Sequence, residues 1–397
     1  MVKAKTSGES GGFDVNLILG YVALTILYIV FYARTSNWMY ISLISSESFQ
    51  LVLLMIGLFV LMVRQAFNFE ATLRRILWSA VLISVSIGIY KSTGRFEPFF
   101  IVMYGLLLSD FPIEKLIKYY AWISIIGVLG LIIGSKIGLL YNFTYLREGH
   151  IRFSLGDTYP TSFSGRITFI YLMVLYLKKE RFFKVFGVPA LVMSALIFRI
   201  TDARVDFVVQ LSVIAVSLVF HFTKMKKMER KIAKLGMFTP SLLTVGFYIA
   251  THAYMRSKNW AYLLDQLLTN RLYWTTVALQ KYDVWTPFGQ NIKMIGAGGL
   301  DGFINTNSGA DGYFFLDSSY ANIPFLNGII FFGLILVVYY AAVRVSLSKQ
   351  DYFYPIVIVI ASFHWIINQY IISPAYSPLF IVAIILLLSN KRVKNDN

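Results

Sequence analysis

The chain of 397 residues is 57% hydrophobic and only 14% charged, with a mean hydropathy of +0.65, which excludes an ordinary soluble domain. Its formal net charge of +16 would suit nucleic acid, but the basic residues stand in short clusters between apolar runs, as membrane orientation signals do. The absence of cysteine excludes disulfides and thiolate metal sites. We therefore expect an all-α, polytopic membrane protein that binds no nucleic acid.

Runs of apolar residues predict about twelve transmembrane helices. In chain order they cover residues 15–33, 49–63, 76–91, 97–110, 119–135, 165–178, 184–200, 204–222, 236–253, 321–343, 353–371 and 377–390. Several runs are shorter than the ~20 residues of a straight crossing, so tilt or a partial helix is an alternative there. No internal repeat is visible, and the paired broken helices of a transporter are not evident.

The runs divide the chain into three predicted parts. Residues 1–253 form a membrane domain with nine spans, residues 254–322 form a hydrophilic extracytoplasmic loop, and residues 323–397 form a membrane domain with three spans and a cytoplasmic tail. The loop has no apolar run that could cross a bilayer. A wet segment of this length in a polytopic protein usually serves chemistry or recognition.

The distribution of lysine and arginine predicts the orientation. If the N-terminus is inside, 22 of the 36 basic residues fall in the short connectors on the cytoplasmic side. Because cytoplasmic connectors carry the excess of positive charge, both termini are predicted to be cytoplasmic. The outer face then carries three wet regions, which are residues 136–165, 199–204 and 254–322.

Several arginines lie on the predicted outer face, where topology does not require positive charge. They are Arg152, Arg166, Arg199, Arg204 and Arg271. Arg166 and Arg204 stand at outer helix starts, where unpaired N–H groups and a guanidinium fork together suit phosphate oxygens. We predict that Arg152, Arg166, Arg204 and Arg271 bind a diphosphate. The alternative for Arg204 is that a neighbouring residue caps the helix while the arginine reaches lipid headgroups.

Three outer aspartates are candidate catalytic residues. Asp317 ranks first as a general base, because it closes the long loop at a helix start. Its alternative role is that of a helix cap, since Asp-Ser-Ser before an apolar run is a capping signal. Asp157 and Asp202 follow, each near a predicted diphosphate-binding arginine. For Asp202, an ion pair with Arg204 or Arg199 is the favoured alternative.

Aromatic residues crowd the wet regions and predict contacts with sugars. Tyr159, Trp274 and Tyr320 are the candidates that adjoin the charged residues. Aromatic faces stack on the C–H surfaces of sugars, but tryptophan and tyrosine also form the interface belt of membrane proteins. Both interpretations carry equal weight.

Four short patterns on the predicted outer face resemble the signatures of one family in order and placement. The run from Arg152 to Pro160, RFSLGDTYP, is similar to Arg-x-Ser-Leu-Gly-x-x-x-Pro. The others are TDAR at 201–204, RLYW at 271–274 with PFG at 287–289, and DSSY at 317–320. Together they resemble the Wzy-type polymerases of O-antigen and capsular polysaccharide, within the O-antigen ligase-like superfamily.

The resemblance implies an enzyme of the bacterial cytoplasmic membrane. Such an enzyme transfers a growing glycan from undecaprenyl diphosphate to the free end of a lipid-linked repeat unit, with inversion at the anomeric carbon. No metal, nucleotide or other cofactor is implied, because arginines supply the counter-charge. The implied partners are an undecaprenyl-diphosphate-linked oligosaccharide, membrane lipid and a chain-length regulator.

Two other functions remain open. A glycan ligase of similar architecture would move a finished polymer to a different acceptor. A lipid-linked oligosaccharide flippase should instead show repeats and ionisable residues at mid-membrane depth. The predicted spans are nearly free of charge, and His364 is the exception. The long outer loop favours the enzymes.

Overall fold

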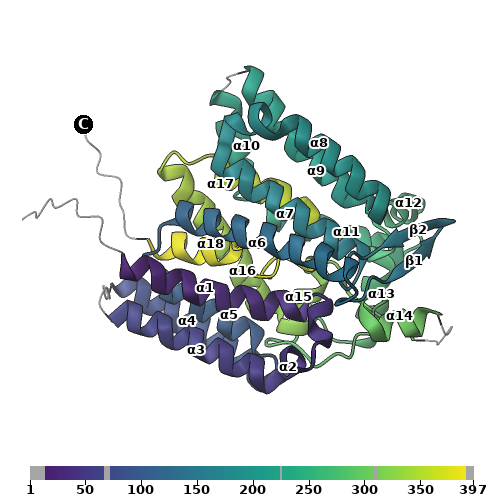
Figure 1. Ribbon diagram of the computed structural model, residues 1–397, viewed down its shortest axis with the longest axis horizontal. Helices are drawn as coiled ribbons and strands as arrows, with labels where there is room; N and C mark the ends of the chain where they lie inside the picture. Colours follow the sequence, from purple (N-terminus) through teal and green to yellow (C-terminus); the bar gives the residue numbers. More distant parts are fainter. Residues whose placement is uncertain (1–13, 67–71, 224–225, 308–311, 390–397) are drawn as a thin grey trace, which may run out of the picture.

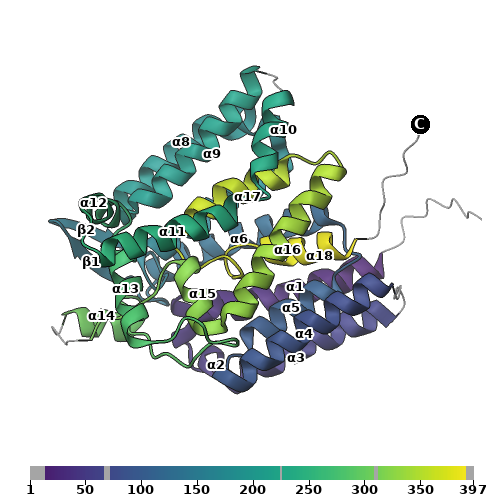
Figure 2. The same cartoon turned by 180° about the vertical axis from the view of Figure 1, so that it is seen from behind.

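The computed structural model describes residues 14–66, 72–223, 226–307 and 312–389, and it is built almost entirely of helices. In this part of the chain a single two-stranded hairpin is the only sheet, which confirms the predicted all-α class. Figures 1 and 2 show β1, β2, α12, α13 and α14 gathered at one end of the helical bundle, which we call the hairpin end.

The first half of the chain forms long helices and the hairpin. Its elements are α1 (Val15–Arg34), η1 (Asn37–Tyr40), α2 (Ser42–Ser45), α3 (Glu47–Ala66), α4 (Leu73–Thr93), α5 (Glu97–Leu107), α6 (Ile113–Lys136), β1 (Thr144–Arg147), β2 (His150–Phe153), α7 (Pro160–Lys178), η2 (Lys179–Arg181) and α8 (Phe182–Thr201). α1 packs against α3, α6 against α7, and α7 against α8.

The second half alternates long helices with short ones. Its elements are α9 (Arg204–Thr223), α10 (Lys226–Leu235), α11 (Thr239–Met255), α12 (Asn259–Leu267), α13 (Arg271–Lys281), α14 (Gly299–Asn307), α15 (Ser319–Asn327), α16 (Ile329–Ser348), α17 (Phe353–His364) and α18 (Leu379–Leu388). The predicted hydrophilic loop thus contains α12, α13, α14 and the start of α15.

A helix lies in each of the twelve predicted ranges, but the helices differ in length. Among the described residues, seven helical stretches are long and apolar enough to cross a membrane, and an eighth qualifies if two segments bent by 53° count together. One of the seven, residues 160–201, contains both α7 and α8. The chain is therefore a polytopic membrane protein by length and composition.

Three of the predicted spans are short helices. α5, α17 and α18 have 11, 12 and 10 residues. At ~1.5 Å per residue each covers roughly half of a ~30 Å hydrocarbon core. Gly105 of α5 lets α18 approach, because a Cβ there would lie 2.7 Å from Ile384. Each of these three helices therefore extends only part of the way across a bilayer.

Residues 365–378 join α17 to α18 as buried, irregular backbone. The side chain of Lys349, just before α17, donates to Ser389, just after α18, so the two helices begin and end at the same side of the bundle. Irregular backbone at membrane depth is tolerated where protein satisfies it. Here its carbonyl groups accept hydrogen bonds from the side chains of Arg166, Arg271, Ser319 and Tyr339.

The Pro-Phe-Gly segment at 287–289 anchors the long loop to the bundle. Gly289 and Gly328 both have positive φ, and a Cβ on either would lie 2.3 Å from a backbone carbonyl oxygen of the other segment. The backbone N–H of Ile329 donates to Thr286, at 3.0 Å. Glycine is required at this crossing because any side chain would separate the loop from the start of α16.

Candidate functional site

The β1–β2 hairpin directs Arg152 into the protein. Its turn, Glu148-Gly149, has positive φ at both positions, as a tight two-residue hairpin requires. Tyr145 and Arg152 are partners across the two strands, and both are buried. Because side chains alternate along a strand, this pair faces the bundle while its neighbours face outward.

The guanidinium of Arg152 forms hydrogen bonds with the protein through two of its three nitrogens, and the third has no partner among the described residues. Its Nε donates to the carbonyl oxygen of Thr201 at 2.7 Å, and Nη1 lies 3.4 Å from the hydroxyl of Tyr159. The Arg152 side chain is almost completely buried, yet Nη2 has no hydrogen-bond partner in the structure. A buried N–H of a cation that lacks an acceptor is unfavourable. The unpaired Nη2 distinguishes Arg152 from Arg166, although both side chains are buried.

Arg166 is saturated by the protein. Its Nε donates to Asp157 at 2.6 Å, Nη1 to Ala375 at 3.1 Å and Nη2 to Thr35 at 2.9 Å. The guanidinium also lies 4.0 Å from the ring centre of Tyr32. The side chains of Arg166 and Asp157 are 2% and 0% exposed. This predicted diphosphate ligand and this predicted catalytic carboxylate therefore bind each other, and neither has a free surface for substrate.

The predicted base and a predicted phosphate-binding arginine meet at the junction of the long loop with the bundle. Arg271 Nη1 lies 3.0 Å from Asp317 Oδ2, with side chains that are 17% and 24% exposed. Arg271 also donates to the carbonyl of Ile367, in the irregular segment. Burial raises the pKa of the Asp317 carboxyl, and the Arg271 guanidinium opposes that rise.

Local backbone geometry sets the position of Arg271. Thr269 and Asn270 both adopt positive φ, which turns the chain sharply before α13 begins at Arg271. The Asp265 carboxylate then accepts hydrogen bonds from the backbone N–H groups of Leu272 and Tyr273, at 2.8 and 3.2 Å. Asp265 thus caps α13 from α12.

Tyr313 lies near the Arg271–Asp317 pair. Burial raises its pKa, nearby Asp317 and Tyr159 raise it further, and Arg271 lowers it. The Tyr313 ring also lies 4.9 Å from the ring of Trp274. Loop residue Gly298 also approaches the hairpin region, because a Cβ there would lie 3.5 Å from Cβ of Tyr159, so the long loop and the hairpin region meet here. We call Arg152, Tyr159, Arg271, Trp274, Tyr313 and Asp317 the junction cluster.

The start of α14 holds the two regions together. The backbone N–H of Gly299 donates to the carbonyl oxygen of Thr158 at 2.8 Å. The neighbouring N–H of Leu300 donates to the hydroxyl of Tyr40. One backbone hydrogen bond, from Gly299 to Thr158, thereby fixes the contact between the long loop and the Arg152–Pro160 motif.

Arg204 and Asp202 lie apart, on the exposed side of the hairpin. Arg204 donates to Glu148 at 2.6 Å and pairs with Asp202 at 3.5 Å, and its side chain is 46% exposed. Asp202 has a positive φ and ends α8. The ion pair between Asp202 and Arg204 is the alternative considered from the sequence.

The three predicted sugar-binding aromatics differ in exposure. Tyr159 and Trp274 are half-buried at the junction cluster. Tyr320 is fully buried, and its hydroxyl donates to the carbonyl of Ser362 at 2.9 Å. Since the Tyr320 ring packs inside the protein, it has no face on which a sugar could stack.

The structure adds a buried histidine–aspartate pair that the sequence analysis did not identify. His364 Nε2 lies 2.7 Å from Asp206 Oδ1 and 3.1 Å from Asn368 Nδ2. Gly165 approaches this group from α7, because a Cβ there would lie 3.7 Å from Asp206. The sequence does contain a signal for this pair, because one aspartate and one histidine stand in apolar runs. Ionisable residues in such runs usually face the protein interior and pair with each other.

No protein-family model, no curated protein and no solved structure matches this chain. The resemblance to the polymerases stays a prediction, and a function has to be inferred from the geometry of the junction cluster.

Proposed function

We propose that this chain is a membrane-embedded glycosyltransferase that polymerises lipid-linked sugars. It would transfer a growing glycan from undecaprenyl diphosphate to the free end of a lipid-linked repeat unit, inverting the anomeric carbon. The observation that carries the proposal is the junction cluster. It combines a buried arginine that has an unpaired nitrogen with the partly exposed Arg271–Asp317 pair.

The cluster contains groups suited to each part of this reaction. The acceptor hydroxyl attacks the anomeric carbon, and the bond from that carbon to the diphosphate oxygen breaks. Asp317 takes the hydroxyl proton, a role favoured by its raised pKa. Arg152 and Arg271 meet the charge that develops on the departing diphosphate. Tyr159 and Trp274 offer half-buried faces to the sugars.

The location of the cluster supports a lipid-linked substrate. It lies where the long loop meets the irregular segment between α17 and α18, between the polar loop segments and the apolar helices. The proposal sets the site on the outer face of a bacterial cytoplasmic membrane, with both termini cytoplasmic. The apolar helices would make twelve crossings, or ten if α17 and α18 enter and leave at one face. Either even number keeps the termini on the same side.

Two alternatives keep specific support. A glycan ligase would use the same donor chemistry with a different acceptor, and the junction cluster suits both. A lipid-linked oligosaccharide flippase gains support from the Asp206–His364 pair, because ionisable pairs inside a helical bundle can serve ion coupling. A chain-length regulator remains a proposed partner of the polymerase.

The decisive experiment is to incubate purified protein with lipid-linked repeat units, without nucleotide or added metal. A ladder of polymer that disappears with Asp317→Asn would support the polymerase. Transfer to an unrelated lipid acceptor without a ladder would indicate a ligase. Movement of the lipid across reconstituted vesicles with no new glycosidic bond would indicate a flippase and would overturn the proposal.

A further inference from the structure

A groove of about 610 Å³ runs along one face of α11 and ends beside α12. The spacing of its residues on α11 follows successive helical turns, so they share one face. The first part of the groove is formed by Thr244, Val245, Tyr248, Ile249, His252 and Ala253. From Thr244 to Arg256 this face extends over ~18 Å at the α-helical rise.

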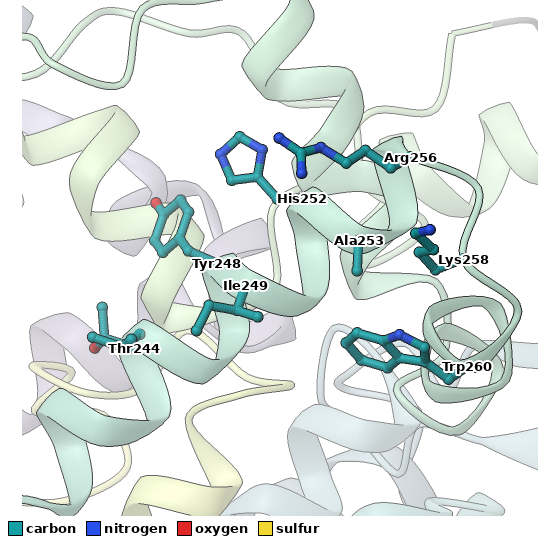
Figure 3. Close-up of a pocket in the computed structure, with 9 residues that line it drawn as sticks. Thr244, Tyr248, Ile249, His252, Ala253, Arg256, Lys258 and Trp260 are labelled. Atoms are coloured by element: carbon teal, nitrogen blue, oxygen red, sulfur yellow. The ribbon is translucent and has the colours of Figure 1, made fainter.

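The two ends of the groove differ in chemistry. The first end is apolar and open, with Val245 and Ile249 57% and 60% exposed. The other end carries His252, Arg256 and Lys258. In Figure 3 the guanidinium of Arg256 points back along α11 toward His252, with Lys258 nearby on the following turn. The groove therefore suits a molecule with a long apolar chain and an anionic head.

The basic end is not neutralised by the protein. Within the described ranges, no carboxylate lies within 4.0 Å of Arg256 or Lys258. Trp260 closes the same end with an indole that is 51% exposed. An exposed tryptophan beside free cations is typical of the level where lipid headgroups lie.

We propose that this groove binds the prenyl chain and the diphosphate of a lipid-linked glycan. The inference rests on the proposed function, and it names the path by which the lipid reaches the site. The two cations, Arg256 and Lys258, with the adjacent imidazole of His252, match the multiple charge of a diphosphate better than the single charge of a phospholipid phosphate. The exposed aliphatic face below them receives the first part of the prenyl chain.

Contacts connect the groove to the junction cluster. The hydroxyl of Tyr248, in the groove wall, donates to the backbone carbonyl of Tyr320 at 3.2 Å. Tyr320 follows Asp317 by three residues. Near the end of α11, the ring of Tyr254 lies 6.5 Å from the ring of Tyr273. Tyr273 stands on the first turn of α13, which begins at Arg271. A headgroup held at the end of α11 thus lies next to the helix that carries a proposed diphosphate ligand.

The test uses full-length protein in detergent and a photoreactive farnesyl diphosphate, with labelled peptides identified by mass spectrometry. We expect labels on α11 between residues 244 and 256. The double variant Arg256→Ala, Lys258→Ala should reduce labelling roughly tenfold, as the loss of charge-assisted contacts requires. The matched control replaces two exposed cations of α10, Arg230→Ala and Lys231→Ala, and should label like wild type.

A second variant tests the apolar part without changing charge. Val245→Trp fills the groove from an exposed position and should also reduce labelling. Equal labelling in all variants would overturn the proposal. It would also be overturned if excess phosphatidylglycerol competed as well as unlabelled farnesyl diphosphate, because the groove would then hold bulk lipid.

The polymer assay separates the two proposals. A wild-type ladder without labels in the groove would reject the groove and leave the glycosyltransferase standing. Labels in the groove that depend on Arg256 and Lys258, with no ladder under any condition, would reject the glycosyltransferase and leave a prenyl diphosphate-binding protein.

Discussion

Among the arginine–aspartate pairs of the described residues, Arg166–Asp157 and Arg271–Asp317 differ in what surrounds them. Arg166–Asp157 is buried, and the guanidinium donates to protein oxygens in three directions. Arg271–Asp317 joins a loop to the bundle and is about one-fifth exposed. The same two residue types therefore form an ion pair that is closed to solvent in one place and an ion pair that is partly open to solvent in the other. Burial and saturation of donors distinguish the two.

The largest effect should come from breaking the buried pair. Asp157→Asn leaves a buried guanidinium without its counter-charge, which costs roughly 3–5 kcal/mol. We expect a low yield of folded protein and a clearly lower unfolding temperature in detergent. Asp317→Asn is the matched control, and it should unfold near the wild-type temperature because its site is partly exposed. Equal unfolding of wild type and Asp157→Asn would contradict the structural role of the pair.

Breaking the exposed pair should instead affect turnover. Asp317→Asn removes the proposed base, and general-base catalysis contributes about 10²–10⁴-fold. We expect polymer formation to fall by that factor while the variant remains folded and still binds lipid-linked substrate. Normal polymer formation by a folded Asp317→Asn protein would remove Asp317 from the mechanism.

Changing the arginine of the exposed pair should have a smaller effect. Arg271→Lys keeps the charge but loses the fork of donors. One charge-assisted hydrogen bond contributes about 1.5–3 kcal/mol, so turnover should fall roughly 10- to 100-fold. Arg204→Lys is the control, because Arg204 is exposed and pairs with Glu148 on the hairpin. If both variants lost activity equally, the separation of Arg204 from the junction cluster would be wrong.

The positions of the helices could be predicted from the sequence better than their lengths. Apolar runs located a helix in every predicted range, because hydropathy reports burial in lipid or protein alike. The same measure extended the eleventh span to residue 371, although α17 ends at His364. Asn368, Gln369, Pro374 and Pro378 interrupt the two last runs and mark the irregular segment. Hydropathy averaged over a window of residues conceals such single polar residues and prolines.

The candidate site could be predicted only as a set of residues. Sequence placed Arg166 and Arg271 in one class, since both are arginines on the predicted outer face, where topology does not require positive charge. Which of them is saturated depends on the backbone oxygens of Thr35 and Ala375, far away in the chain. No local pattern encodes such a contact. Tyr313 gained its place in the same way, through the contact of its ring with Trp274.

The smallest effect concerns pH and again separates the two pairs. Burial raises the pKa of Asp317. As a base it must be ionised, so turnover should rise with pH through this raised pKa and then level off. The folded state holds the proton more tightly than the unfolded state, so the contribution of Asp317 to stability should fall over the same rise in pH. Activity and unfolding temperature, measured across this window, should therefore change in opposite directions in wild type. In Asp317→Asn the part of the stability change that Asp317 contributes should disappear, and a pH–activity profile that falls with rising pH would rule out the carboxylate as the base.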